Sequence, residues 1–363
     1  MTLRISHALR RNFAGVLVAL LSGCANLGYY AQAVDGHMDI RHRTQPISTI
    51  IADPNASPAL KDALTVVVKL REFASHKLKL PDNQSFTTYA DLGRPYAVWN
   101  VSATPELSME LKKWCFVAIG CVSYRGFFSK IEAERFAKGL KAKGYDVTVG
   151  GVRAYSTLGW FKDPILNTFL GYSETELAQL IFHELAHQVV YVRDDSTFNE
   201  SFATAVELEG VGRWLDSNGT DEQRAAFDAS QQKKAASTGI MLNHRKRLED
   251  LFASDASNAE KRKAKALILA ELREKLSALE VTEARVSTYE RWWAQRLNNA
   301  YLASISTYTH LVPAFQALLA QQKGNIEQFY EAVKRIGNLP EAERASLLQQ
   351  TDSGSQTAAN SVR

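Results

Sequence analysis

The segment His183-Glu184-Leu185-Ala186-His187 has residue types and a spacing that can bind a zinc ion and activate a water molecule for hydrolysis. In a helix, the spacing of four places both imidazoles on one face, where they can bind one ion. Glu184 lies about 100° round the helix from His183, close enough to take a proton from a zinc-bound water without binding the metal. The alternative is a solvated helix face with polar residues. Because the flanking residues are largely apolar, buried polar side chains here need partners, which favours metal ligation.

Two predicted helices must hold this segment. Ser173-x-x-Glu176 has the pattern of a capping box, and the first helix is expected to run from there to about Val192. A second helix is expected over 198–215, ending near Asn218-Gly219. The short connection 193–197 indicates a tight turn between antiparallel helices, which would return the second helix to the metal.

A catalytic zinc site of this type needs a third protein ligand. Metzincins supply it from a histidine six residues after the second one, but Arg193 occupies that position here. The segment Asn199-Glu200-Ser201-Phe202-Ala203 instead resembles the N-E-x-F-A segment of gluzincin peptidases, the clan of thermolysin and the membrane alanyl aminopeptidases. The resemblance implies that Glu200 is the third ligand and that Asn199 and Glu207 support the ligands from outside. Two alternatives remain open: Glu200 caps its own helix, or Glu207 is the third ligand.

Substrate-binding residues are indicated less directly. Gluzincins bind extended substrate along a sheet edge, and the segment Gly151–Trp160 is the candidate edge strand; its alternative is an ordinary core strand. A Tyr, His or Arg is expected to stabilise the oxyanion. Tyr301, Tyr308 and His310 are candidates, and we select Tyr308. The segment G-A-M-E-N, which binds the substrate amine in alanyl aminopeptidases, does not occur in the sequence.

The N-terminus has the pattern of a bacterial lipoprotein signal. Arg4, Arg10 and Arg11 precede a nine-residue apolar stretch, which is too short to span a bilayer as a helix. The segment Leu21-Ser22-Gly23-Cys24 resembles a lipobox, which implies that residues 1–23 are removed and that Cys24 carries a lipid anchor. Ala25 is not the Asp that favours inner-membrane retention, so the outer membrane facing the periplasm is expected. The alternative is a buried N-terminal helix with an incidental cysteine.

Cys115 and Cys121 are then the two remaining cysteines, an even number in an oxidising compartment. Gly120 between them lets the chain turn back. We expect a disulfide that closes this short loop; two buried free thiols are the alternative.

Length and composition give the fold class. The 363 residues are 45% hydrophobic and 23% charged, as in ordinary globular proteins. Without residues 1–23 the chain carries 40 basic and 39 acidic side chains, so no nucleic-acid partner is expected. We predict an α+β fold with four parts: signal peptide 1–23, a small mixed α/β lobe with an edge strand and the cysteine loop over 24–165, a mainly helical zinc-peptidase lobe over 166–349, and a disordered tail over 350–363.

Coarse patterns place the remaining elements. Residues 25–57 contain proline breakers and are expected to be irregular, whereas 221–349 carry further helical patterns. Helices are predicted over 58–76 and 129–143, and strands within 84–104 and 145–161.

Together, the lipobox, the Trp114 to Cys121 loop and the two zinc motifs resemble a family of bacterial lipoproteins described as putative aminopeptidases. The resemblance implies a zinc-dependent aminopeptidase, anchored by lipid in the envelope, that acts on a peptide or protein with one Zn²⁺ ion. An envelope endopeptidase and a non-catalytic envelope assembly lipoprotein with a structural zinc are the alternatives. A structural site would have four protein ligands, whereas a catalytic site keeps one position open.

Overall fold

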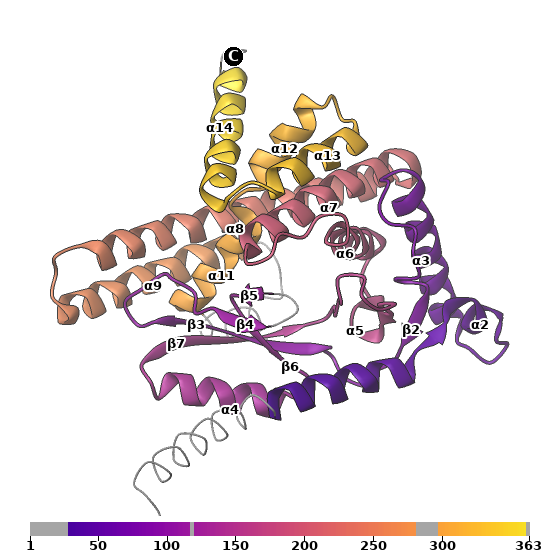
Figure 1. Ribbon diagram of the computed structural model, residues 1–363, viewed down its shortest axis with the longest axis horizontal. Helices are drawn as coiled ribbons and strands as arrows, with labels where there is room; N and C mark the ends of the chain where they lie inside the picture. Colours follow the sequence, from indigo (N-terminus) through magenta and orange to yellow (C-terminus); the bar gives the residue numbers. More distant parts are fainter. Residues whose placement is uncertain (1–27, 117–119, 281–296, 361–363) are drawn as a thin grey trace, which may run out of the picture.

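A computed structural model describes residues 28–116, 120–280 and 297–360. Most of them are helical and the strands are short, so the protein has the predicted α+β fold with a mainly helical body (Figure 1). The expected signal segment 1–23 and Cys24 lie outside the described residues. No helix in the described ranges combines the length and apolar character that a membrane crossing requires.

Within these ranges the strands form three small sheets. One joins β1, β2 and β8, the second joins β6, β3 and β7, and the third is the hairpin of β4 and β5. The bounds are β1 (Gln45–Pro46), β2 (Thr88–Ala90), β3 (Val98–Pro105), β4 (Trp114–Phe116), β5 (Gly120–Val122), β6 (Arg125–Phe127), β7 (Tyr145–Val152) and β8 (Ile165–Leu166).

The antiparallel pair of β3 and β7 is the longest, and it runs from Val98 opposite Val152 to Pro105 opposite Tyr145. Because β7 pairs with β3 alone among the described strands, it forms an edge of its sheet. Because β7 ends at Val152, only the first two residues of the predicted edge strand Gly151–Trp160 are in a strand. Beyond them, the buried Asp163 carboxylate accepts hydrogen bonds from Ser156 Oγ and from the backbone N–H and hydroxyl of Thr157, which bends the segment away from a ladder.

Helices provide most of the remaining structure. One covers residues 28–43. The others are α2 (Ile47–Ala52), α3 (Pro58–His76), α4 (Lys130–Lys141), α5 (Asn167–Leu170), α6 (Glu174–Ala186), α7 (Ser196–Asn218), α8 (Asp221–Ala253), α9 (Asn258–Glu280), α11 (Asn299–Thr309), α12 (Val312–Gln321), α13 (Ile326–Gly337) and α14 (Glu341–Asn360).

Three local expectations differ from the structure. Residues 25–57 are not irregular, because the helix at 28–43 and α2 occupy much of this range; Pro46 caps α2 and Pro58 begins α3, so these prolines mark helix starts. The helix with the histidines ends at Ala186 rather than near Val192. At the other end, α14 continues to Asn360, into the range expected to be a disordered tail.

The largest core packs α6 and α7 against α3, α12 and α13. Its side chains come from both sides of residue 165, so the two lobes expected from the sequence share this core. Helix α7 is buried along most of its length. The largest side chains of the α6–α7 region and of the helices over it are almost fully buried: Phe182, Phe198, Phe202, Phe315 and Phe329. A burial of this extent fixes α6 and α7 relative to each other.

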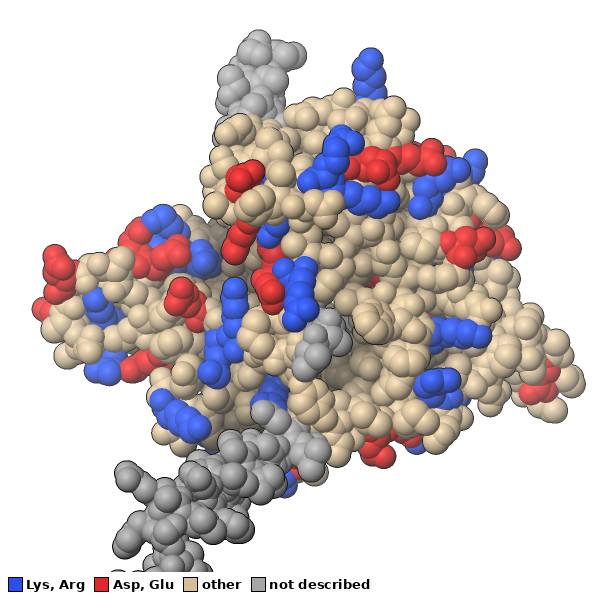
Figure 2. Space-filling view, viewed as in Figure 1, with Lys and Arg blue, Asp and Glu red and all other residues tan. Residues whose placement is uncertain are grey.

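Charged side chains of both signs are interspersed on the face drawn in Figure 2. Its described residues show no continuous basic surface there.

Candidate metal site

His183 and His187 lie at the end of α6 and meet Glu200 from the first turns of α7. The Nε2 atoms of the two histidines are 3.2 Å apart. Glu200 Oε2 lies 3.2 Å from His183 Nε2 and 3.6 Å from His187 Nε2. The three ligand atoms all lie within 4.8 Å of one another, so this group can hold a metal ion.

Local sequence explains why α6 presents both imidazoles. Both hydrogen bonds of the predicted capping box are present: Glu176 N–H donates to Ser173 Oγ, and Ser173 N–H donates to the Glu176 carboxylate. The helix then buries Leu177, Ile181 and Leu185 in the core. This fixes its rotation, and the histidines consequently face α7.

The connection between α6 and α7 is held by side chains of α7 itself. Asn199 is buried, accepts a hydrogen bond from Val192 N–H and donates one to the Val192 carbonyl, both at 2.7 Å. Asp195 caps α7 by accepting from Phe198 N–H, and Arg344 binds the same carboxylate at 2.7 Å. Asn199 thus supports the site through the turn, not through contact with an imidazole.

These contacts bear on the role of Glu200. Because Asp195 is the N-cap and α7 begins at Ser196, Glu200 lies beyond the first turn and does not cap its helix. The Glu200 side chain is 16% exposed and is directed at the two imidazoles.

Glu207 lies two turns further along α7 and contacts the far side of His183. Its Oε2 is 2.8 Å from His183 Nδ1, and its Oε1 accepts a hydrogen bond from Gln179 at 3.3 Å. A carboxylate can only accept here, so His183 donates its Nδ1–H to Glu207, and Nε2 is the ring nitrogen that can bind a metal. Glu207 is therefore placed to orient His183, as the sequence pattern predicts.

The resulting arrangement calls for a cation. With Nδ1–H of His183 bonded to Glu207, Nε2 faces a carboxylate oxygen and a second imidazole nitrogen. Burial opposes the charged form of His183, but hydrogen bonds and charges of Glu200 and Glu207 outweigh it and hold the pKa of His183 well above its ordinary value. Burial likewise disfavours ionised Glu200, yet the two histidines hold the pKa of Glu200 far below its usual range. A divalent ion can take the place of the Nε2 proton and bind the same three atoms, so the residues fit a site for a divalent metal ion such as zinc.

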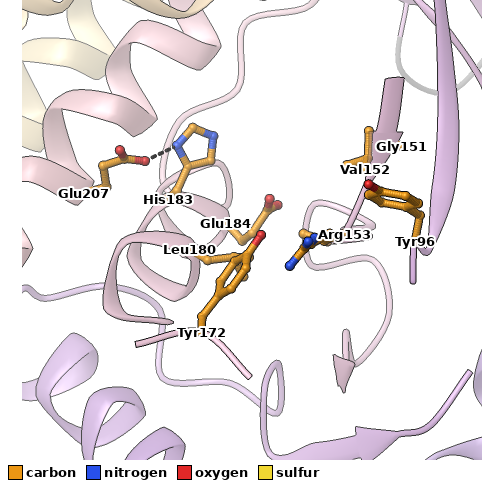
Figure 3. Close-up of a pocket in the computed structure, with 10 residues that line it drawn as sticks. Tyr96, Gly151, Val152, Arg153, Tyr172, Leu180, His183, Glu184 and Glu207 are labelled. Carbon is orange, nitrogen blue, oxygen red and sulfur yellow. Dashed lines mark hydrogen bonds and ion pairs between the residues drawn. The ribbon is translucent and has the colours of Figure 1, made fainter. Parts of the chain in front are cut away.

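Glu184 belongs to the same helix but is directed into a cavity beside the metal ligands (Figure 3). Burial raises the pKa of Glu184, against the lowering effect of His183 and His187. A carboxylate of raised pKa next to a metal site is suited to accept and return a proton.

The cavity has a volume of about 360 Å³. One wall is α6, with His183 and Glu184, and the opposite wall is the end of β7 and the residues after it (Figure 3). The lining residues are Tyr96, Gly151, Val152, Arg153, Ala154, Tyr172, Leu180, His183, Glu184 and Glu207. The edge strand predicted to bind substrate thus ends opposite the predicted general base.

Two tyrosines lie within electrostatic reach of the site carboxylates. Tyr308 is 43% exposed, and the charge of Glu200 is the largest of the causes that raise the pKa of its hydroxyl well above the ordinary value. Burial is the main cause that raises the pKa of Tyr124, followed by Glu200. The sequence indicates Tyr308 as a candidate oxyanion donor, but it does not indicate Tyr124. Its position two residues after β5 carries no motif, so only the fold could indicate it.

The other two candidates for an oxyanion donor, Tyr301 and His310, have other contacts. Tyr301 packs against the apolar cluster between α8, α9 and α11. His310 caps the end of α11 through its backbone.

The predicted disulfide between Cys115 and Cys121 is present, and it joins directly opposite residues of the hairpin β4–β5. The backbone N–H of Cys121 donates to the carboxylate of Asp194, in the connection between α6 and α7. Gly120 lies so close to Arg193 and Asp194 that a Cβ would clash with their side chains, and its φ is +79°. The hairpin is thereby fixed against the turn between α6 and α7, the helices that carry the candidate metal ligands.

Comparison with known proteins gives one match. The model of a family described as "Putative aminopeptidase" matches residues 28–348. No curated protein and no solved structure matches the chain. The matched range contains α6, α7, β7 and every residue of the cavity.

Proposed function

Since the chain belongs to the family described as "Putative aminopeptidase", we propose that it is a zinc-dependent peptidase with aminopeptidase activity. His183, His187 and Glu200 would hold one zinc ion, and Glu184 would act as the general base. One observation carries the proposal: the ligand atoms of the two histidines and Glu200 lie close together, and they lie beside a cavity that Glu184 lines. Three protein ligands next to a cavity favour a catalytic site over a structural one, which uses four.

The residues divide the chemistry between them. When bound, zinc supplies Lewis acidity, which polarises a peptide carbonyl and acidifies water. Glu184 takes the proton from the attacking water and returns it to the leaving amine. Glu207 fixes the orientation of His183. The hydroxyl of Tyr308, which is protonated at neutral pH like that of any ordinary tyrosine, is a donor for the developing oxyanion.

The location belongs to the same proposal. The basic and apolar segments before Cys24 favour a lipid-anchored protein of the bacterial envelope, in the outer membrane facing the periplasm. The disulfide between Cys115 and Cys121 suits an oxidising compartment. Incorporation of a labelled fatty acid into the wild type, and its loss in Cys24→Ser, tests the anchor.

The activity is tested by comparing the wild type with Glu184→Gln for zinc content and for hydrolysis of a mixed peptide library. We expect zinc in both proteins and cleavage by the wild type alone. Glu209→Gln is the matched control, because Glu209 lies on α7 in an ion pair with Arg213 and does not line the cavity. Zinc in a wild type that cleaves nothing would contradict the peptidase proposal and favour a structural zinc.

The fragments also separate exopeptidase from endopeptidase. An aminopeptidase requires a free substrate amine, so N-terminally blocked peptides should remain intact. Internal cleavage of blocked peptides would overturn the aminopeptidase assignment and leave the peptidase assignment standing.

A further inference from the structure

Arg153 follows directly after β7 and lines the cavity that contains Glu184. Its guanidinium lies 5.1 Å from the centre of the Tyr172 ring and 5.8 Å from the centre of the Tyr96 ring. Figure 3 shows the side chain between these two rings. Stacking on both aromatic faces restricts the guanidinium to one place in the cavity wall.

The surrounding structure keeps this arrangement in position. Thr168 Oγ1 donates a hydrogen bond of 2.6 Å to the Arg153 carbonyl, which fixes the backbone. The Tyr96 ring packs so closely over Gly151 that a Cβ there would lie 2.5 Å from it. Tyr172 immediately precedes Ser173, the cap of α6, and is thereby tied to the helix that carries Glu184.

Arg153 forms no ion pair within the ranges that the structure describes, although its side chain is exposed to solvent in the cavity. Arg213 and Arg344, by contrast, each bind a carboxylate at 2.7 Å. A guanidinium offers five N–H donors in a planar fork that matches a carboxylate. The donors of Arg153 are therefore available to a ligand in the cavity.

We propose that Arg153 is a specificity-determining residue that binds a carboxylate of the peptide substrate. The inference rests on the proposed peptidase function. The cavity joins Arg153 to Glu184, so this carboxylate belongs to a residue close to the scissile bond. The volume of about 360 Å³ is sufficient for a short segment of peptide.

A peptide offers this carboxylate from two sources, the C-terminus and the side chain of Asp or Glu. Two matched peptide pairs distinguish them. One pair differs only in a free or amidated C-terminus, and the other, amidated in both members, differs only in Glu or Gln. A preference within the first pair identifies a C-terminal carboxylate, and a preference within the second an acidic side chain.

The experiment measures binding of these peptides to the zinc-loaded full chain carrying Glu184→Gln, so that turnover does not interfere. We expect the anionic member of one pair to bind about tenfold more tightly, as for a hydrogen-bonded charge pair open to solvent. Adding Arg153→Gln should bring that ratio close to one. Arg41→Gln is the matched control and should keep the ratio, because Arg41 is also exposed and stacked on an aromatic ring, Phe161, but does not line the cavity.

Equal binding within both pairs, or a preference that survives Arg153→Gln, would overturn the inference. Failure of the proposed function has a different signature. In that case the wild type cleaves no peptide in the library. The binding assay needs no turnover, so the preference for the anionic peptide and its loss in Arg153→Gln still test the role of Arg153.

Discussion

His183 Nδ1 lies 2.8 Å from Glu207 Oε2, and this contact determines which nitrogen of His183 remains open for a metal. The two residues are 24 positions apart and come from different helices. Because the carboxylate holds the proton on Nδ1, the lone pair of Nε2 points at His187 and Glu200. The carboxylate also makes the imidazole a stronger ligand.

Glu207→Ala is expected to weaken zinc binding ten- to hundredfold, the usual effect of removing a carboxylate that orients a ligand histidine. Glu207→Gln should have a smaller effect, since an amide oxygen still accepts from Nδ1–H. Competition with a chromophoric chelator measures the affinity. Complete loss of zinc in Glu207→Ala, with zinc retained in Glu200→Ala, would instead identify Glu207 as the third ligand.

Asn199→Ala is expected to lower the free energy of unfolding by about 2 kcal/mol, because two buried hydrogen bonds of about 1 kcal/mol each are lost at Val192. Urea unfolding measures this change. Asn218→Ala is the control: its single bond to the Trp214 carbonyl lies at the end of the same helix, and less than about 1 kcal/mol is expected. Equal losses in the two variants would show that the contact with Val192 has no special importance.

Tyr308→Phe is expected to lower kcat about 100-fold while zinc remains bound, as for the loss of one oxyanion donor. The hydroxyl can donate at neutral pH because the ordinary pKa of tyrosine, about 10, lies well above 7. Steady-state kinetics on one peptide measure the effect. Tyr124→Phe tests the second tyrosine near Glu200, and Tyr145→Phe, at the far end of β7, is the control. A large loss in Tyr124→Phe alone would transfer the role to Tyr124.

The double variant Cys115→Ser/Cys121→Ser is expected to lose about 2 kcal/mol of unfolding free energy, the value for closing so short a loop. It should also lose peptidase activity, since the hairpin contacts Asp194 in the turn beside the ligands. A reductant should reproduce both effects in the wild type and have none in the variant. A double variant as stable and active as the wild type would contradict this coupling.

Much of the site depends on short-range rules and could therefore be predicted from the sequence. The spacing of His183 and His187 places both on one side of a helix whatever the helix packs against, and Ser173 with Glu176 caps that helix by contacts three residues apart. Cys115 and Cys121 are only six residues apart and pair across one hairpin, so their contact is also local in the sequence. The boundaries of α3 and the mixed fold class likewise follow from local hydrophobic patterns.

Only the tertiary structure could decide how residues of different elements meet. Both Glu200 and Glu207 are on α7, and the packing of α6 against it directs the first to both imidazoles and the second to the far side of His183. Asn199 was expected near the ligands but binds the turn at Val192. Tyr124 and Arg153 belong to no motif. Their positions depend on where a hairpin and an edge strand pack against the helices, and that is set by burial of the whole core rather than by neighbouring residues in the sequence.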